Sequence, residues 1–101
     1  MTEQVAEIVR FKLREGADEA AFVDSAKGTV DFVAEQKGFV RRSLSKSDDG
    51  VWVDYVEWRS LDDALAAAKR VEAEPSFEPF LTDIDLASIE MRHQTIKMYT
   101  D

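Results

Sequence analysis

The stretch FVRRSLSKSDDGVWVDYVEWR, residues 39–59, decides the fold of this chain. Two runs of strand-forming residues, 39–47 and 51–59, flank the turn sequence Asp48-Asp49-Gly50. An Asp-Gly step between two such runs predicts a β-hairpin, because glycine readily adopts the positive φ that tight hairpin turns require. The middle of the chain is therefore expected to be an antiparallel strand pair.

The register of this hairpin depends on the length of its loop. If Asp49 and Gly50 form the two-residue loop of a type I′ turn, each residue of the first strand has a defined partner on the second. The pairs predicted in this way are Leu44 with Tyr55, Arg42 with Glu57, and Arg41 with Trp58. The second pair matches opposite charges and the third places a cation beside an indole ring, so both are favourable.

The segments on either side of the hairpin complete a β-α-β-β-α-β order. The patterns predict a first strand, a first helix capped by Asp18, a second helix that starts with Ser60 and Asp63, a short irregular segment and a last strand. Their expected bounds are residues 4–13, 18–37, 60–75, 75–81 and 86–98. Right-handed connections place the strands in the order 4-1-3-2, with all neighbours antiparallel and both helices on one face. The expected fold class is α+β with a ferredoxin-like topology.

The strands carry apolar residues on both of their faces. In the first strand, one face holds Val5, Val9, Phe11 and Leu13, and Glu7 is the residue that interrupts it. The opposite face begins with the apolar residues Ala6 and Ile8. A strand with two apolar sides needs a layer on each side. We therefore expect the helices on one face of the sheet and a second copy of the chain on the other, which makes a homodimer and a dimeric α+β barrel.

Each helix is expected to bury one stripe of residues at helical spacing. In the first helix the stripe consists of Phe22, Ala26, Thr29 or Val30, and Val33. In the second helix it consists of Ala64, Leu65, Ala68 and Val71.

Length and composition limit the classes of function. The 101 residues fit a single domain, 1–101, and the absence of cysteine excludes disulfides and thiolate metal sites. The net charge of −8 repels nucleic acid and anionic membrane surfaces, and no apolar run approaches the ~20 residues of a membrane span. No metal-ligand spacing and no phosphate-binding loop is present. We expect a cytoplasmic protein that binds neither nucleic acid nor membrane and carries no metal or cofactor.

Several segments together resemble the dimeric α+β-barrel superfamily, which includes the antibiotic biosynthesis monooxygenase-like proteins and the stress-responsive α/β-barrel proteins. They are residues 7–13, the helix end at Gly38-Phe39, the hairpin with Trp52 and Trp58, the helix start at residues 60–64 and the closing strand. The resemblance covers nearly the whole chain and implies a homodimer of two facing sheets with helices outside. It also implies a small ligand between helices and sheet, with activities that range from cofactor-free oxidation of quinol-like aromatics and haem degradation to binding without known chemistry. Stress-responsive members commonly carry histidine where Glu7 stands, so the role of that histidine is not carried over.

His93 and Glu7 are the candidate catalytic residues. His93 is the only histidine and hence the only side chain that ordinarily titrates near neutral pH, and it alternates with Ile89 and Met91 on an apolar strand face. Glu7 breaks an apolar strand face, where an unpaired carboxylate would be costly. The first and last strands are neighbours in this topology, so the two side chains are expected to meet. Such a pair suits proton transfer, and it suits a structural hydrogen bond equally well.

Aromatic and charged residues supply the candidate ligand-binding set: Trp58, Tyr55, Trp52, Arg92, Phe22, Phe77 and Phe80. Aromatic side chains in these strands and loops can hold a planar ligand, and they can equally fill a core or an interface. Arg92 is expected to pair with Glu90 at an interface, with a role as anchor for a substrate carboxylate as the alternative.

The leading functional hypothesis is a homodimeric, cofactor-free oxygenase that acts on a small aromatic or quinol-like compound. The alternative is a non-catalytic small-ligand-binding or stress-responsive dimeric barrel protein, and a remote alternative is a haem-binding or haem-degrading protein. Whether the chain is an enzyme and which small hydrophobic or aromatic molecule it takes are left open by the sequence.

Overall fold

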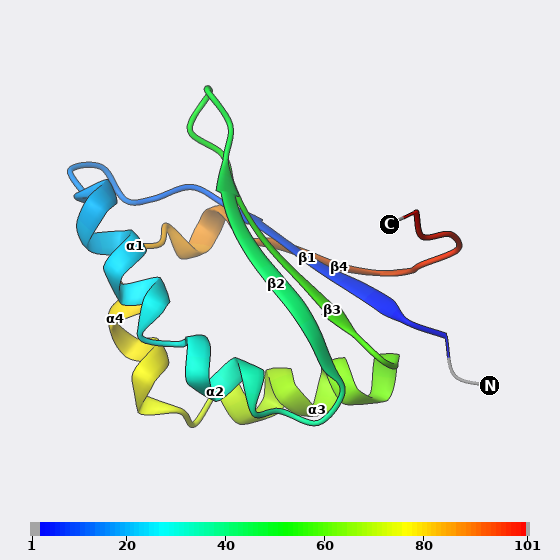
Figure 1. Cartoon of the computed structure of the whole chain (residues 1–101). Coiled ribbons are helices and arrows are strands. Elements are labelled where there is room, and N and C mark those ends of the chain that lie inside the picture. Colours follow the sequence, from blue (N-terminus) through cyan, green and yellow to red (C-terminus); the bar gives the residue numbers. More distant parts are fainter. Residues whose placement is uncertain (1–2, 101) are drawn as a thin grey trace.

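A computed structural model of the chain describes residues 3–100 (Figure 1). The four strands follow each other in the expected order, but four helices stand where two were expected, and two short 3-10 turns, η1 and η2, lie in the second half. Their bounds are β1 Val5–Phe11, α1 Glu19–Lys27, α2 Val30–Ala34, β2 Phe39–Lys46, β3 Trp52–Trp58, α3 Leu61–Val71, η1 Pro75–Phe77, α4 Glu78–Thr82, η2 Leu86–Ser88 and β4 Glu90–Thr95.

The four strands form one antiparallel sheet in the order β2-β3-β1-β4. This is the strand order expected from the sequence, so the α+β, ferredoxin-like fold class is confirmed. Figure 1 shows all four helices on one side of the sheet and the C-terminal segment after β4 on the other. We call these the helix face and the open face of the sheet.

The register of the hairpin differs from the expectation by one residue. The amide N–H of Ser47 donates to the carbonyl of Val51, and Gly50, at φ 87°, donates to the carbonyl of Ser47. The loop therefore has three residues, 48–50, with glycine in the left-handed position that such loops favour. The pairs predicted for a two-residue loop are wrong, and the observed pairs are Leu44 with Asp54, Ser43 with Tyr55, Arg42 with Val56 and Arg41 with Glu57.

An irregularity near the start of β2 shifts the register by one further residue at the other end of the hairpin. The register shifts between Phe39 and Arg41, so that Phe39 pairs with Trp58. An extra residue on one strand lets side chains on both sides of it point to the same face. Phe39 and Arg42 consequently both lie on the helix face.

The first helix is shorter than expected because it breaks at residues 28–29. α1 ends at Lys27, and Thr29 turns its hydroxyl back to the carbonyl of Ala26 at 2.6 Å before α2 begins. Glycine is a poor helix former, and a threonine hydroxyl bonded to its own backbone competes with helical hydrogen bonds. The buried stripe Phe22, Ala26, Thr29 and Val33 is confirmed. Of the two alternatives for its third position, Thr29 is buried and Val30 is exposed.

The second half of the chain departs from the expectation in two places. The Ser60 hydroxyl accepts the N–H of Asp63 as expected for a cap, but Leu65 is exposed and Ala67 takes a buried place in α3. The last strand is six residues long, because residues 86–88 form the turn η2, which the Asp85 carboxylate caps. This cap explains why the strand begins at residue 90 rather than at 86.

An aromatic cluster forms the core where α1 and α4 meet the sheet. The rings of Phe22 and Phe80 stack with centroids 5.1 Å apart, and Trp52 meets Phe22 edge-on at 5.0 Å. Phe11, from β1, packs edge-on against both phenylalanines. Edge-on and offset contacts of this kind stabilise aromatic pairs beyond the area that they bury. The cluster fixes one end of the space between helices and sheet.

Candidate functional site

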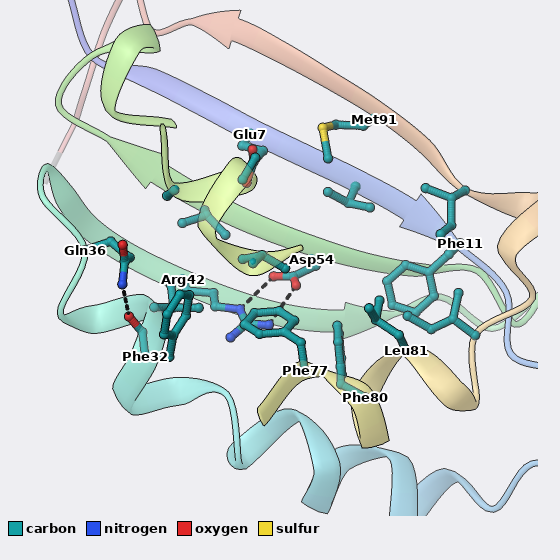
Figure 2. Close-up of a pocket in the computed structure, with 18 of the residues that line it drawn as sticks. Glu7, Phe11, Phe32, Gln36, Arg42, Asp54, Phe77, Phe80, Leu81 and Met91 are labelled. Atoms are coloured by element: carbon teal, nitrogen blue, oxygen red, sulfur yellow. Dashed lines mark hydrogen bonds and ion pairs between the residues drawn. The ribbon is translucent and has the colours of Figure 1, made fainter. Parts of the chain in front are cut away.

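A pocket of about 190 Å³ lies between the helix face of the sheet and the helices that cover it (Figure 2). The helices α2, α3 and α4 contribute side chains to it, as do strands from the centre and the edge of the sheet. Most of its wall is apolar, and the main apolar side chains are Val9, Phe32, Val56, Phe77, Phe80 and Ile84. For scale, an engineered apolar cavity of about 150 Å³ accommodates benzene. The pocket is therefore large enough for a small aromatic molecule.

One side of the pocket reaches solvent near the edge strand β4. Met91 and Leu81 line the pocket and are nevertheless exposed. Figure 2 shows Met91 on the edge strand and Leu81 on α4. The exposed part of the pocket wall therefore includes side chains of β4 and α4.

Five polar side chains interrupt the apolar wall. They are Glu7, Gln36, Arg42, Asp54 and Trp58. Few polar groups in a largely apolar concave site are the usual makeup of small-ligand pockets, because those groups orient the ligand.

Glu7 and His93 meet as the sequence predicts. They lie opposite each other on β1 and β4, and the Oε2 of Glu7 is 3.0 Å from the Nε2 of His93. Glu7 lines the pocket, whereas His93 stands behind it at the sheet edge. The imidazole therefore satisfies a carboxylate that would otherwise be costly to bury.

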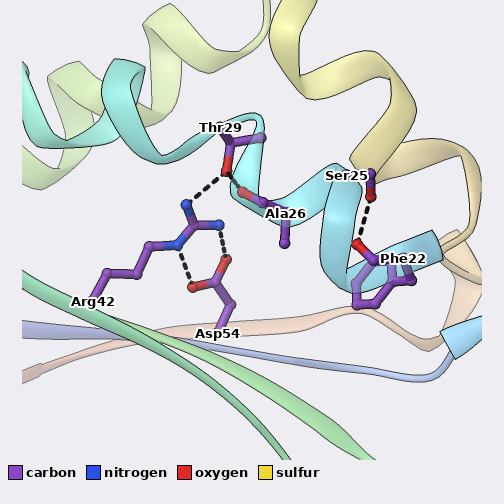
Figure 3. A network of polar contacts seen from close by, with 6 residues as sticks. All are labelled: Phe22, Ser25, Ala26, Thr29, Arg42 and Asp54. Carbon is purple, nitrogen blue, oxygen red and sulfur yellow. Dashed lines mark hydrogen bonds and ion pairs between the residues drawn. The ribbon is translucent and has the colours of Figure 1, made fainter. Parts of the chain in front are cut away.

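Arg42 and Asp54 form a second charged pair on the helix face (Figure 3). The Nε and Nη2 of Arg42 donate to the two carboxylate oxygens of Asp54 at 2.9 and 2.8 Å, and its Nη1 donates to the hydroxyl of Thr29 at 2.7 Å. Both charged side chains are only 11% exposed. The Thr29 hydroxyl in turn donates to the Ala26 carbonyl near the end of α1. The network therefore connects the break between α1 and α2 to the sheet.

Trp58 carries a buried donor without a partner. Its indole Nε1 has no hydrogen-bond partner among residues 3–100, although the residue is 3% exposed and lines the pocket. Buried donors are satisfied in the great majority of proteins, so this unpaired indole N–H is an exception among the described residues.

The open face holds a separate polar group around Glu57. The Tyr99 hydroxyl donates to the buried Glu57 carboxylate, and the Nε of Arg41 lies 3.5 Å from the same carboxylate. The hydrogen bond to Glu57 raises the pKa of Tyr99 to about 12. Desolvation raises the pKa of Tyr55, with Glu57 adding to the effect. These groups face away from the pocket.

The structure divides the sequence-predicted site residues into three groups. Glu7, Trp58, Phe77 and Phe80 line the pocket, and His93 contacts Glu7. Trp52 and Phe22 belong to the aromatic core beside it. Tyr55 and Arg92 are on the open face, where Glu90 lies 3.8 Å from Arg10 on the neighbouring strand. The expected interface pair of Arg92 with Glu90 stays a prediction.

Two charged pocket residues, Arg42 and Asp54, were missed as candidates. The two-residue loop assigned Arg42 to the face shared with Glu57, so its contact with Asp54 could not be anticipated. A three-residue loop would have indicated the contact, since it places both residues on the face of Val56.

Among residues 3–100 there is no group of three or more His, Asp or Glu side chains that could hold a metal ion. Within the same residues, every helix is too short or too polar to cross a membrane.

Comparison with known proteins identifies the class of this fold. No protein-family model and no curated protein matches the chain. Among solved structures, the chain is similar to SnoaB, a cofactor-independent oxygenase from Streptomyces nogalater, with 25% identity, a TM-score of 0.66, and 99% of this chain and 97% of that chain covered. A candidate antibiotic biosynthesis monooxygenase from Bordetella bronchiseptica gives 13% identity and a TM-score of 0.81, with 96% of this chain and 100% of that chain covered. Rv0793 from Mycobacterium tuberculosis gives 17% identity and a TM-score of 0.70, with 97% of this chain and 99% of that chain covered.

The chain has the fold of the antibiotic biosynthesis monooxygenase-like α+β-barrel proteins. The resemblance inferred from the sequence is thereby confirmed.

Proposed function

We propose that this chain is a cofactor-free oxygenase that binds a small phenol or quinol between its helices and its sheet. The observation that carries the proposal is the apolar pocket with an unpaired indole donor, Trp58, and a carboxylate, Glu7, on its wall. The similarity to a cofactor-independent oxygenase along almost the full length of both chains supports the same class of chemistry.

The polar residues of the pocket have distinct roles in this proposal. The indole N–H of Trp58 donates to an oxygen atom of the bound ring and fixes its orientation. Glu7 takes the proton of the phenolic hydroxyl as a general base, and His93, bonded to its Oε2, holds the carboxylate in place and stabilises its charge. The apolar rings around the ligand exclude water from the ionised intermediate.

The reaction that fits these roles is oxidation of the phenolate by dioxygen. An ionised phenol is rich enough in electrons to reduce dioxygen directly. At a ring carbon that carries hydrogen, one oxygen atom becomes a new carbonyl and the other leaves as water with the hydrogens of the hydroxyl and of that carbon. The product is a quinone, so atoms and electrons balance without a further reductant.

Oxygen uptake tests this proposal. Purified protein is incubated with a panel of naphthols and quinols, and uptake is compared for the wild type, Glu7→Gln, His93→Gln and Trp58→Phe. Removal of a general base typically costs about 10²–10⁴-fold in rate, so Glu7→Gln should nearly abolish uptake. Arg92→Gln, on the open face, is the matched control and should retain the wild-type rate. Uptake that does not differ between wild type and Glu7→Gln would contradict the assignment of the base.

One observation also favours a second candidate, a ligand-binding protein without turnover. Glu7 and His93 are already bonded to each other, which is what a purely structural pair requires. In that case the naphthols should quench the fluorescence of Trp58 without any uptake of oxygen. Trp52→Phe leaves Trp58 as the single tryptophan and makes this signal specific.

We further propose that the protein is a cytoplasmic homodimer in which the open face of each sheet meets a second copy. Ile8, Val53 and Tyr55 are half-buried apolar or aromatic side chains on that face, in support of this arrangement. Light scattering at micromolar concentration should give twice the chain mass of 11.4 kDa. A mass equal to a single chain would contradict the dimer.

A further inference from the structure

Arg42 is the only lysine or arginine among the described residues that line the pocket. The other charged side chains on the wall are Glu7 from β1 and Asp54 from β3, and His93 from β4 stands behind Glu7. No charged side chain of α2, α3 or α4 lines it within residues 3–100. The positive charge available to a bound molecule therefore comes from one guanidinium.

The guanidinium of Arg42 retains hydrogen-bonding capacity. Its five N–H donors include three that are used by Asp54 and Thr29 in the structure of residues 3–100, which leaves one on Nη1 and one on Nη2. Its central carbon lies 5.7 Å from the ring centroid of Phe80, another pocket residue. A charged group that is buried with free donors at the wall of a cavity is a natural partner for an oxygen atom of a ligand.

A structural role alone does not require a charged pair at this position. Replacement of buried ion pairs by apolar residues of similar volume is often neutral or stabilising. The pair also places one positive charge on the wall of the pocket in which the reaction proposed above develops a negative one.

We propose that Arg42 binds the oxyanion of the ionised ring, so that the pocket selects hydroxylated aromatics that react as phenolates. This inference rests on the proposed function and adds the form in which the substrate binds. Asp54 holds the guanidinium by two hydrogen bonds and offsets part of its charge. Because Glu7 and Asp54 are both acidic, aromatic carboxylates, which arrive already charged, are bound more weakly than neutral phenols.

The probe for this inference is 4-nitrophenol, whose anion is coloured and whose neutral form is not. Binding is measured by equilibrium dialysis, and the pKa of the bound probe is read from its visible absorbance as the pH is varied. An opposite charge close by typically lowers the pKa of an acid by about 1–3 units. In the wild type, the pKa of bound 4-nitrophenol should therefore lie about one unit or more below that of the free probe.

Two variants separate electrostatics from structure. Asp54→Asn keeps Arg42 and removes the charge that offsets it, so the pKa of the bound probe should fall further. The double variant Arg42→Met/Asp54→Leu removes both charges without leaving either one unpaired, and the shift should disappear. A merely structural pair predicts no such opposite changes. Arg41→Met, one residue away but on the open face, is the control and should leave the probe unaffected.

The outcomes distinguish this inference from the function on which it rests. A wild type that does not bind 4-nitrophenol at millimolar concentration overturns both, because the pocket then takes no hydroxylated ring. A probe that binds with the pKa of the free phenol, or with the same pKa in all variants, overturns the role of Arg42 alone. Urea denaturation of each variant verifies that it is folded under the conditions of the titration.

Discussion

Truncation of Phe80 tests whether the pocket and the aromatic core are one packed unit. The residue is 4% exposed, its ring stacks on Phe22 at 5.1 Å, and Arg42 lies 5.7 Å above it. It also meets Phe11 and Phe77 edge-on at 6.3 and 5.9 Å. Phe80 thus connects the core at α1 with the wall of the pocket.

The free-energy cost of Phe80→Ala can be worked out from these contacts. Loss of the buried ring removes about 1.5–3 kcal/mol of transfer free energy. The cavity that remains brings the usual total for such a truncation to about 3–5 kcal/mol. Three aromatic contacts at about 0.5–1.5 kcal/mol each argue for the upper half of that range. A domain of this size has about 5–15 kcal/mol of stability in total, so the variant should be marginally folded.

Thermal unfolding followed by circular dichroism is the assay. For a domain near this length, each kcal/mol corresponds to a change of about 4 °C or more in Tm, so Phe80→Ala should lower Tm by roughly 12 °C or more. Leu81→Ala is the matched control, because the neighbouring residue also lines the pocket but is exposed, and its Tm should fall by a few degrees at most. Equal losses of Tm in the two variants would refute the packing described here. Added 1-naphthol should restore part of the Tm of Phe80→Ala by filling the enlarged cavity.

Two other predictions concern parts of the fold outside the pocket. The hydrogen bond from Tyr99 to Glu57 raises the pKa of the phenol from its ordinary value of 10.0 to about 12, so its stabilising effect is present below pH 10 and is lost as the pH rises towards 12. An absorbance titration of tyrosinate should show this late ionisation, and Tyr99→Phe should remove it. Gly38→Ala should destabilise the fold more than Gly16→Ala, since both glycines have a positive φ but a Cβ at Gly38 would lie 2.2 Å from a carboxylate oxygen of Asp63, whereas Gly16 has open space. Equal midpoints of urea denaturation for the two alanine variants would contradict this account.

The strand order could be predicted because it depends on coarse features of the sequence. Strands that are apolar on both faces, helices with one buried stripe, and right-handed connections leave few alternatives. The contact of Glu7 with His93 was predicted from this order, which makes β1 and β4 neighbours, and from the strand face that each residue occupies. Features that depend on element type and sequence order were therefore accessible.

Features that depend on the position of a single residue were not accessible. The sequence DDG permits a loop of two or three residues, and the choice reverses the face on which Arg42 lies. The break after α1 depends on the hydroxyl of Thr29. In the folded chain this hydroxyl donates a hydrogen bond to the Ala26 carbonyl and accepts one from Arg42. A helical pattern in the sequence does not contain this information, because the hydrogen bond that Arg42 donates to Thr29 comes from a strand that follows later.

The exposure of Leu65 illustrates the same limit. Apolar periodicity assigned Leu65 to the buried stripe of α3, yet the buried places of this helix are taken by Ala64 and Ala67. The face of Arg92, by contrast, could be predicted, because alternation along the last strand places it on the face opposite His93.

The three-residue loop of the hairpin has a consequence for how pockets of this kind change during evolution. A loop at the surface tolerates insertions and deletions more readily than a packed wall does. A slip of one position between β2 and β3, as in a hairpin in which residues 48 and 51 close a two-residue loop, would turn Arg41, rather than Arg42, towards the helices. Which arginine places its charge inside the cavity is thus set partly by whether a distant turn uses two or three residues.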